Sequence, residues 1–248
     1  MDWKDQGLVL GVRRHGETSV ILELMTHHHG RYLGLVRGGR SRKMRPMLQP
    51  GNLLNIEWRA RLDEHLGYYQ VEPELLRAAT IMEHRASLFC LQVLAIHLRL
   101  LPERESYAHM YRAANIILDH ADIPKISTHL LIRFELALLE ALGFGLSLNK
   151  CVVSGTTRDL VWVSPKSGCA VCRREGEPWA EKLLVLPKLM LDQNQRSDEL
   201  VSIEDLEAGL RLTGHFLERN VYIPRAQTAP DERAKLISEL SKADAIKG

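Results

Sequence analysis

Hydrophobic and polar residues alternate with a period of two over the first 71 residues, which is the spacing of β-strands. The alternation indicates strands within residues 8–13, 20–24, 32–36 and 54–59, and a shorter fifth strand over 67–71. The turns at 14–17 and 27–30 are short enough to close hairpins. Five short strands with a long connection after the third predict a small closed Greek-key barrel of the OB type, with an SH3-like barrel as the alternative.

The hydrophobic period changes to that of α-helices after residue 72. Thr80 and Glu83 have the spacing of a capping box ahead of a first helix that Pro102 closes. Further helices are indicated over 104–120, after Pro124 up to Gly143, from the capping pair Ser202 and Asp205 onward, and over 231–241. The sequence therefore predicts an α+β protein with an OB-fold domain over residues 1–79. A helical domain over 80–248 follows, with a small β insertion at about 146–180.

The charge of the chain is unevenly distributed. The net charge of +2 divides into +3 over residues 1–80 and −1 over the remainder, and residues 25–56 contain six bases and no acid. A window of this length without a carboxylate produces a local positive potential, which is typical of a polyanion site. A phosphate backbone is the obvious ligand, and a solvated loop with a chance excess of bases is the alternative.

Arginine dominates the bases of this barrel, and a guanidinium group can bind phosphates through paired donors and stack on bases. We expect these side chains to form a groove across one side of the barrel, with Tyr32 as a possible stacking platform and Trp58 in the core. The predicted DNA-binding residues are Arg13, Arg14, Arg31, Tyr32, Arg37, Arg40, Arg42, Lys43, Arg45 and Arg59.

Three of the four cysteines, Cys151, Cys169 and Cys172, fall within 22 residues. A structural zinc site normally uses two C-x-x-C pairs, but the first pair here is C-x-x-S, because Ser154 stands at its fourth position. A serine hydroxyl is a poor zinc ligand. We therefore expect a vestigial hairpin without metal, with zinc bound by the three cysteines as the alternative, and no other cofactor.

Other functional classes have weaker support. The sequence has no P-loop, no dinucleotide fingerprint, no G-x-S-x-G and no H-E-x-x-H, so we expect no enzymatic activity. The consecutive histidines 27–29 would point in different directions from a hairpin turn, which predicts an exposed polar turn rather than a metal site. No apolar run reaches the length of a membrane span, and the first residues do not have the pattern of a secretory signal, so we expect a cytoplasmic protein.

Four segments together resemble the RecO family of bacterial recombination mediators. They are V-L-G-V-R-R-H-G-E-T-S at 9–19, G-R-Y-L-G-L-V-R-G-G-R-S-R-K at 30–43, F-E-L-A-L-L-E-A-L-G-F at 134–144 and V-S-P-K-S-G-C-A-V-C at 163–172. The resemblance extends over essentially the whole chain. It implies an N-terminal OB fold and a helical C-terminal domain with a zinc-finger-like insertion.

The resemblance also implies a function in DNA repair. Members of this family bind single- and double-stranded DNA, anneal complementary strands and work with RecR, the acidic tail of single-strand-binding protein, and RecA. It further implies a bacterial cytoplasmic, nucleoid-associated location. The alternative that remains open is a non-enzymatic scaffold that binds RNA or an acidic protein through the same basic barrel.

Overall fold

The computed structural model describes residues 1–62, 65–191 and 201–245. The chain forms two compact units, Met1–Ile123 and Pro124–Gly248. The first three helices therefore belong to the same compact unit as the strands that precede them. The predicted boundary at 79/80 lies just after the first helix begins at Ala78, whereas the compact units divide further along the chain.

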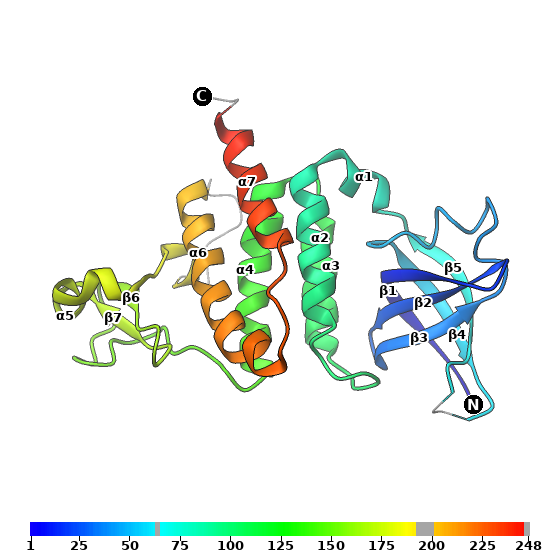
Figure 1. Ribbon diagram of the computed structural model, residues 1–248, viewed down its shortest axis with the longest axis horizontal. Helices are drawn as coiled ribbons and strands as arrows, with labels where there is room; N and C mark the ends of the chain where they lie inside the picture. Colours follow the sequence, from blue (N-terminus) through cyan, green and yellow to red (C-terminus); the bar gives the residue numbers. More distant parts are fainter. Residues whose placement is uncertain (63–64, 192–200, 246–248) are drawn as a thin grey trace. The chain divides into compact units, whose positions relative to one another are not determined.

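The first unit begins with five strands that close into a barrel (Figure 1). They are β1 (Asp2–His15), β2 (Ser19–Thr26), β3 (Gly30–Val36), β4 (Leu53–Arg59) and β5 (Tyr68–Leu75). Their order around the barrel is β1-β2-β3-β5-β4, and β4 pairs back with the first half of β1. Every pairing is antiparallel except that of β3 with β5. The alternating pattern thus located all five strands, although β1 and β5 extend well beyond their predicted ranges.

The barrel interior is filled by the side chains that alternate inward. Leu22, Leu24 and Trp58 are completely buried, so the predicted core position of Trp58 is confirmed. The indole Nε1 of Trp58 donates to the carbonyl of Leu66 at 3.1 Å. A Cβ atom on Gly67 would lie 2.4 Å from the same indole, and the φ of Gly67 is +65°, so only glycine fits at this turn.

The long connection between β3 and β4 is anchored by Asn52, whose side chain is completely buried. The amide Nδ2 of Asn52 donates to the carbonyls of Pro46 (2.9 Å) and Met47 (3.0 Å). Its Oδ1 accepts the backbone N–H of Ala78 at 2.9 Å, and its carbonyl accepts the N–H of Val9 at 2.9 Å. One side chain therefore fixes the connection and the start of the first helix.

The first unit ends with α1 (Ala78–Glu83), α2 (Arg85–Leu98) and α3 (Ala108–Asp119). The predicted capping box of Thr80 and Glu83 is wrong, because α1 already begins at Ala78. Long-range contacts decide this start: Asn52 holds the N–H of Ala78, and the buried Arg77 bonds to Asp119 and Asn115 of α3. The chain also breaks at His84, where one continuous helix was predicted.

The second unit combines helices with a three-stranded sheet of order β7-β6-β8. Its elements are α4 (Pro124–Ala141), β6 (Leu160–Val163), β7 (Ala170–Cys172), α5 (Arg173–Gly176), η1 (Glu177–Lys182), β8 (Leu184–Val185), η2 (Lys188–Met190), α6 (Ile203–Leu217), η3 (Glu218–Tyr222), η4 (Ile223–Arg225) and α7 (Glu232–Ala245). The predicted cap of α6 is confirmed, because the Ser202 hydroxyl accepts the N–H of Asp205 at 3.1 Å.

A buried polar network joins three helical segments of the second unit. The carboxylate of Glu135 on α4 accepts hydrogen bonds from Thr213 on α6 and from Arg233 on α7. Burial lowers the pKa of Arg233 to about 10, which leaves the guanidinium charged at neutral pH and able to neutralise Glu135. No helix in the described residues combines the length and the apolar character needed to cross a membrane.

Asn52→Ala should lower the free energy of unfolding by about 2–4 kcal/mol, because it leaves two partly buried carbonyls and one buried N–H without their partner. Urea denaturation of the full chain measures this loss. Asn149→Ala, at an exposed asparagine of the second unit, is the control and should stay within about 0.5 kcal/mol of wild type. Equal midpoints for the two variants would contradict this account of the connection.

Candidate nucleic-acid interface

The connection between β3 and β4, residues 37–52, is called the basic loop below. Leu48 is 2% exposed, and Met44 and Met47 pack against the barrel core, so the loop has an apolar underside. Consecutive turns hold its backbone, including N–H donation from Met44 to Ser41 and from Leu48 to Met44. The outward positions carry Arg42, Lys43 and Arg45, all exposed. The loop is thus a folded platform that presents cations to solvent.

Three arginines gather around one hollow of about 390 Å³ beside this loop. Arg14 comes from β1, whereas Arg40 and Arg45 come from the basic loop, and the apolar side chains of Val12 and Val20 form part of the wall. Among the residues that the structure describes, none of those that line the hollow is acidic. Three guanidinium groups around an uncharged floor form a site suited to phosphate oxygens.

Arg40 also connects the basic loop to the turn between β1 and β2. Its Nη1 donates to the carbonyls of Gly16 and Glu17, and its backbone N–H donates to the carbonyl of Thr18 at 3.1 Å. The side chain therefore has a structural role in addition to its place at the hollow.

An exposed aromatic ring lies between two further predicted arginines. Arg37 places its guanidinium carbon 4.4 Å from the ring centroid of Tyr68, which is 46% exposed. Arg59 is the direct cross-strand neighbour of Tyr68 and is also exposed. Arg59 bonds to Glu57, and this hydrogen bond lowers the pKa of Glu57. Tyr68 was absent from the predicted site, although strand alternation with the buried Tyr69 already indicated that it faces outward.

Two of the predicted DNA-binding residues, Arg31 and Tyr32, contact other residues of the first unit instead of solvent. Arg31 is largely buried and forms ion pairs with Glu23 (3.1 Å) and Glu103 (2.9 Å), so its charge is neutralised inside the protein. Tyr32 is 4% exposed and packs in the barrel core, with Arg104 over its ring. The structure therefore places both side chains in the interior of the unit, and their contact with DNA stays a prediction.

Arg13 and Arg14 point to opposite faces of β1, because successive side chains of a strand alternate. Arg14 pairs in register with Val20, on the face of the barrel interior, and Arg13 pairs with Ile21 on the outer face. Both side chains are exposed. Only Arg14 reaches the hollow, so Arg13 stays a predicted contact outside it.

The cysteine cluster of the second unit provides a poor fit for zinc. The carbonyl of Cys169 accepts the N–H of Ser164 within the hairpin, and the Ser154 hydroxyl lies 3.6 Å from the sulfur of Cys172. Within the described residues, the three sulfurs do not form a group of metal-ligating atoms within 4.8 Å of one another. With a serine as the fourth member, this donor set does not match a tetrahedral zinc site.

The protein itself stabilises one of these thiols in its charged form. Burial opposes ionisation of Cys151, but hydrogen bonds from the hydroxyl and N–H of Ser154 and from the N–H groups of Cys172 and Val153 lower its pKa to about 6. Hydrogen-bond donors of the chain thus provide stabilisation that a metal ion would otherwise supply to a thiolate.

Family comparisons agree with this architecture. Residues 1–74 match the model described as recombination protein O N terminal, and residues 85–229 match that of recombination protein O C terminal. The chain is 49% identical over 243 residues to the DNA repair protein RecO of Brucella abortus (strain 2308), covering 98% of this chain and 97% of the relative. It is 51% identical over 243 residues to that of Sinorhizobium medicae (strain WSM419), covering 98% and 96%.

These matches place the chain in the class of DNA repair and recombination proteins. It belongs to the RecO family. The resemblance found in the sequence is therefore confirmed across both halves of the chain.

Arg31→Gln should lower the free energy of unfolding by about 1–2 kcal/mol, because it removes two partly buried ion pairs. The affinity for single-stranded DNA should stay within about twofold, since Arg31 is not presented to solvent. Urea denaturation and fluorescence anisotropy measure the two quantities. Arg42→Gln is the matched variant and should show the opposite pattern, and a larger loss of affinity in Arg31→Gln would return Arg31 to the binding site.

Proposed function

We propose that this protein is a DNA repair and recombination mediator that binds single- and double-stranded DNA and anneals complementary strands. In this proposal it also helps to load a recombinase onto single strands that another protein covers. The observation that carries the proposal is the grouping of Arg14, Arg40 and Arg45 around one hollow, next to the exposed Arg42 and Lys43. The family assignment supports the repair context.

The chemistry of the interface suits a mediator better than an enzyme. Guanidinium groups bind phosphate oxygens without reading the bases, so a bound strand keeps its Watson–Crick edges free to pair. The exposed ring of Tyr68 offers a stacking surface that tolerates any base. The proposed role is therefore to hold strands by charge, with no catalytic step.

The finer architecture and the partners belong to the same proposal. The five-stranded barrel and its strand order support an OB fold as the DNA-binding part. RecR, the acidic tail of single-strand-binding protein, and RecA are the proposed protein partners, and the bacterial cytoplasm is the proposed location. The candidates for binding the acidic tail are Arg99, Arg104, Arg112 and Arg133, of which Arg99 pairs with Glu23 and Arg104 lies over the ring of Tyr32.

Replacing Arg42 and Lys43 together with Glu should lower the affinity for single-stranded DNA by about 10- to 100-fold and impair annealing. With about four phosphate contacts, the log–log salt slope of wild type should be near −3, and the double variant should fall to about half of this value. Arg40 is left unchanged because it holds the β1–β2 turn.

The control for this experiment is the reversal of Arg173 and Arg174 to Glu, which changes the net charge equally in the second unit. An equal loss in both double variants would mean that net charge, rather than the basic loop, drives binding. Affinity that does not depend on salt would contradict nucleic-acid binding altogether. Tighter binding of RNA than DNA of the same sequence would favour the scaffold alternative.

Tyr68→Ala should weaken single-stranded DNA binding by about 5- to 150-fold, because stacking on one aromatic side chain contributes roughly 1–3 kcal/mol per base. Duplex binding should change little, since paired bases are already stacked. Anisotropy titrations with matched single and double strands measure the difference. Tyr68→Phe keeps the ring and should restore the single-strand affinity, and a failure to restore it would remove stacking as the explanation.

A further inference from the structure

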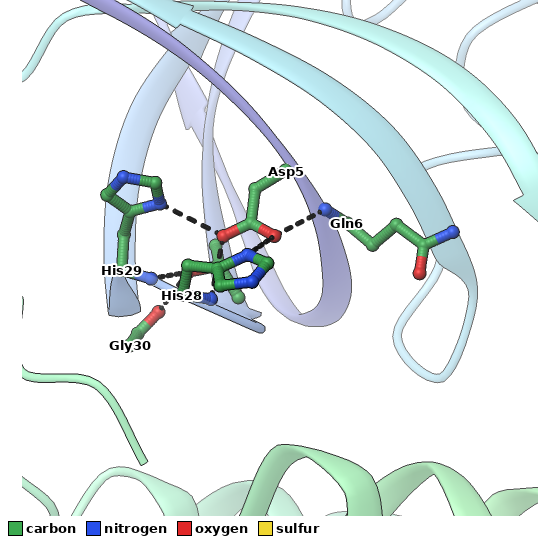
Figure 2. Close-up of polar contacts among 6 residues, drawn as sticks. Asp5, Gln6, His28, His29 and Gly30 are labelled. Atoms are coloured by element: carbon green, nitrogen blue, oxygen red, sulfur yellow. Dashed lines mark hydrogen bonds and ion pairs between the residues drawn. The ribbon is translucent and has the colours of Figure 1, made fainter. Parts of the chain in front are cut away.

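The turn between β2 and β3 is organised around one carboxylate, that of Asp5 on β1. Figure 2 shows this carboxylate surrounded by polar contacts. Its oxygens accept the backbone N–H groups of Gln6 and His28, both at 2.8 Å, and lie 3.1 Å and 3.0 Å from Nδ1 of His28 and His29. The Asp5 side chain is only 2% exposed. Asp5 thus contacts two of the three consecutive histidines, although it lies 23 positions before His28 in the sequence.

We propose that Asp5, His27 and His28 bind a divalent transition-metal ion, with zinc as the best match. One ligand atom from each of these residues lies within 4.8 Å of the other two. Within the described part of the chain, no other group of three histidine, cysteine or acidic residues meets this condition. Two imidazoles with one carboxylate form a ligand set that suits zinc and related ions better than calcium or magnesium, which prefer oxygen ligands alone.

The spacing of the donor atoms fits the proposed coordination. Nδ1 of His28 and Oδ1 of Asp5 are 3.1 Å apart. Two ligands at the usual zinc distances of 2.0–2.1 Å are separated by about 3.3 Å in a tetrahedron. An ion that replaces the proton between these two atoms would therefore require little movement of either side chain. The neutral imidazole of His28 would then carry its proton on Nε2.

The surrounding turn is held by contacts that do not require an ion. The His29 ring stacks on Trp3 with centroids 4.0 Å apart, and the Thr26 hydroxyl accepts the N–H of His29 and donates to the carbonyl of Gly30. The φ of Gly30 is +66°, a conformation that glycine adopts without strain. His29 therefore positions the carboxylate and the turn, while the rings of His27 and His28, 4.2 Å apart, remain as ligands.

A hollow of about 850 Å³ gives an ion access to this group. Asp5, His27 and His28 line it together with Glu57 and Glu72 and the single base Lys4. This lining has an excess of carboxylates, in contrast to the arginine-lined hollow beside the basic loop. It attracts cations and leaves room for a water molecule as the fourth ligand. An ion bound here would tie the β2–β3 turn to β1 and stabilise the barrel.

The test is a titration of the metal-stripped full-length protein with zinc chloride, followed by calorimetry. Wild type should bind one equivalent, and His27→Ala should lose at least tenfold in affinity. His15→Ala, at an exposed histidine outside the turn, and Cys169→Ser should both retain the site. No saturable binding by wild type, or binding that is lost in Cys169→Ser and kept in His27→Ala, would overturn the proposal.

Two further measurements do not depend on the folding of a variant. Saturating zinc should raise the thermal midpoint of wild type by about 5–10 °C, since only the folded state has the assembled ligands. Cobalt in place of zinc should give a visible spectrum without a thiolate-to-cobalt charge-transfer band. The presence of that band would assign the ion to the cysteines and reject the site at Asp5. Because neither readout uses DNA, the result is independent of the proposed function.

Discussion

The buried side chain of Asn52 is the constraint on which the proposed interface depends. It satisfies two carbonyls of the basic loop and the first N–H of α1, and its backbone bonds to β1. A buried amide that lost these partners would leave several polar groups unsatisfied, at a cost of about 1–3 kcal/mol each. The backbone of the basic loop is therefore attached through Asn52 to both β1 and α1, next to the exposed cations of the loop.

Carboxylates of the first unit determine which of its basic side chains can bind an external ligand. Glu23 on β2 pairs with Arg31 at 3.1 Å and with Arg99 at 2.8 Å, so both of these charges are used to join parts of the same unit. The basic loop has no acid of its own. Its positive potential is consequently retained at the surface, even though the net charge of the chain is only +2.

Local patterns in the sequence were sufficient for the strands, for the Ser202 cap of α6 and for the position of the basic loop. They failed where a residue far along the chain decides the outcome. The period of the strands does not reveal the ion pair of Arg31 with Glu103, and the start of α1 was misplaced because Asn52 sets it. Likewise, the prediction for histidines 27–29 considered only the turn itself. Their contacts with Asp5 join two distant parts of the chain and cannot be found from a local pattern.

The choice of arginine at position 40 follows from its double role. One nitrogen, Nη1, holds the β1–β2 turn through two carbonyls. A guanidinium group carries five N–H donors in a planar fork, so Nε and Nη2 still offer three donors toward the hollow. A lysine ammonium also has three donors, but they all belong to one nitrogen, so the turn and a phosphate would both have to lie around that single atom. The planar fork of Arg40 therefore allows one side chain to hold the turn and to offer donors at the hollow.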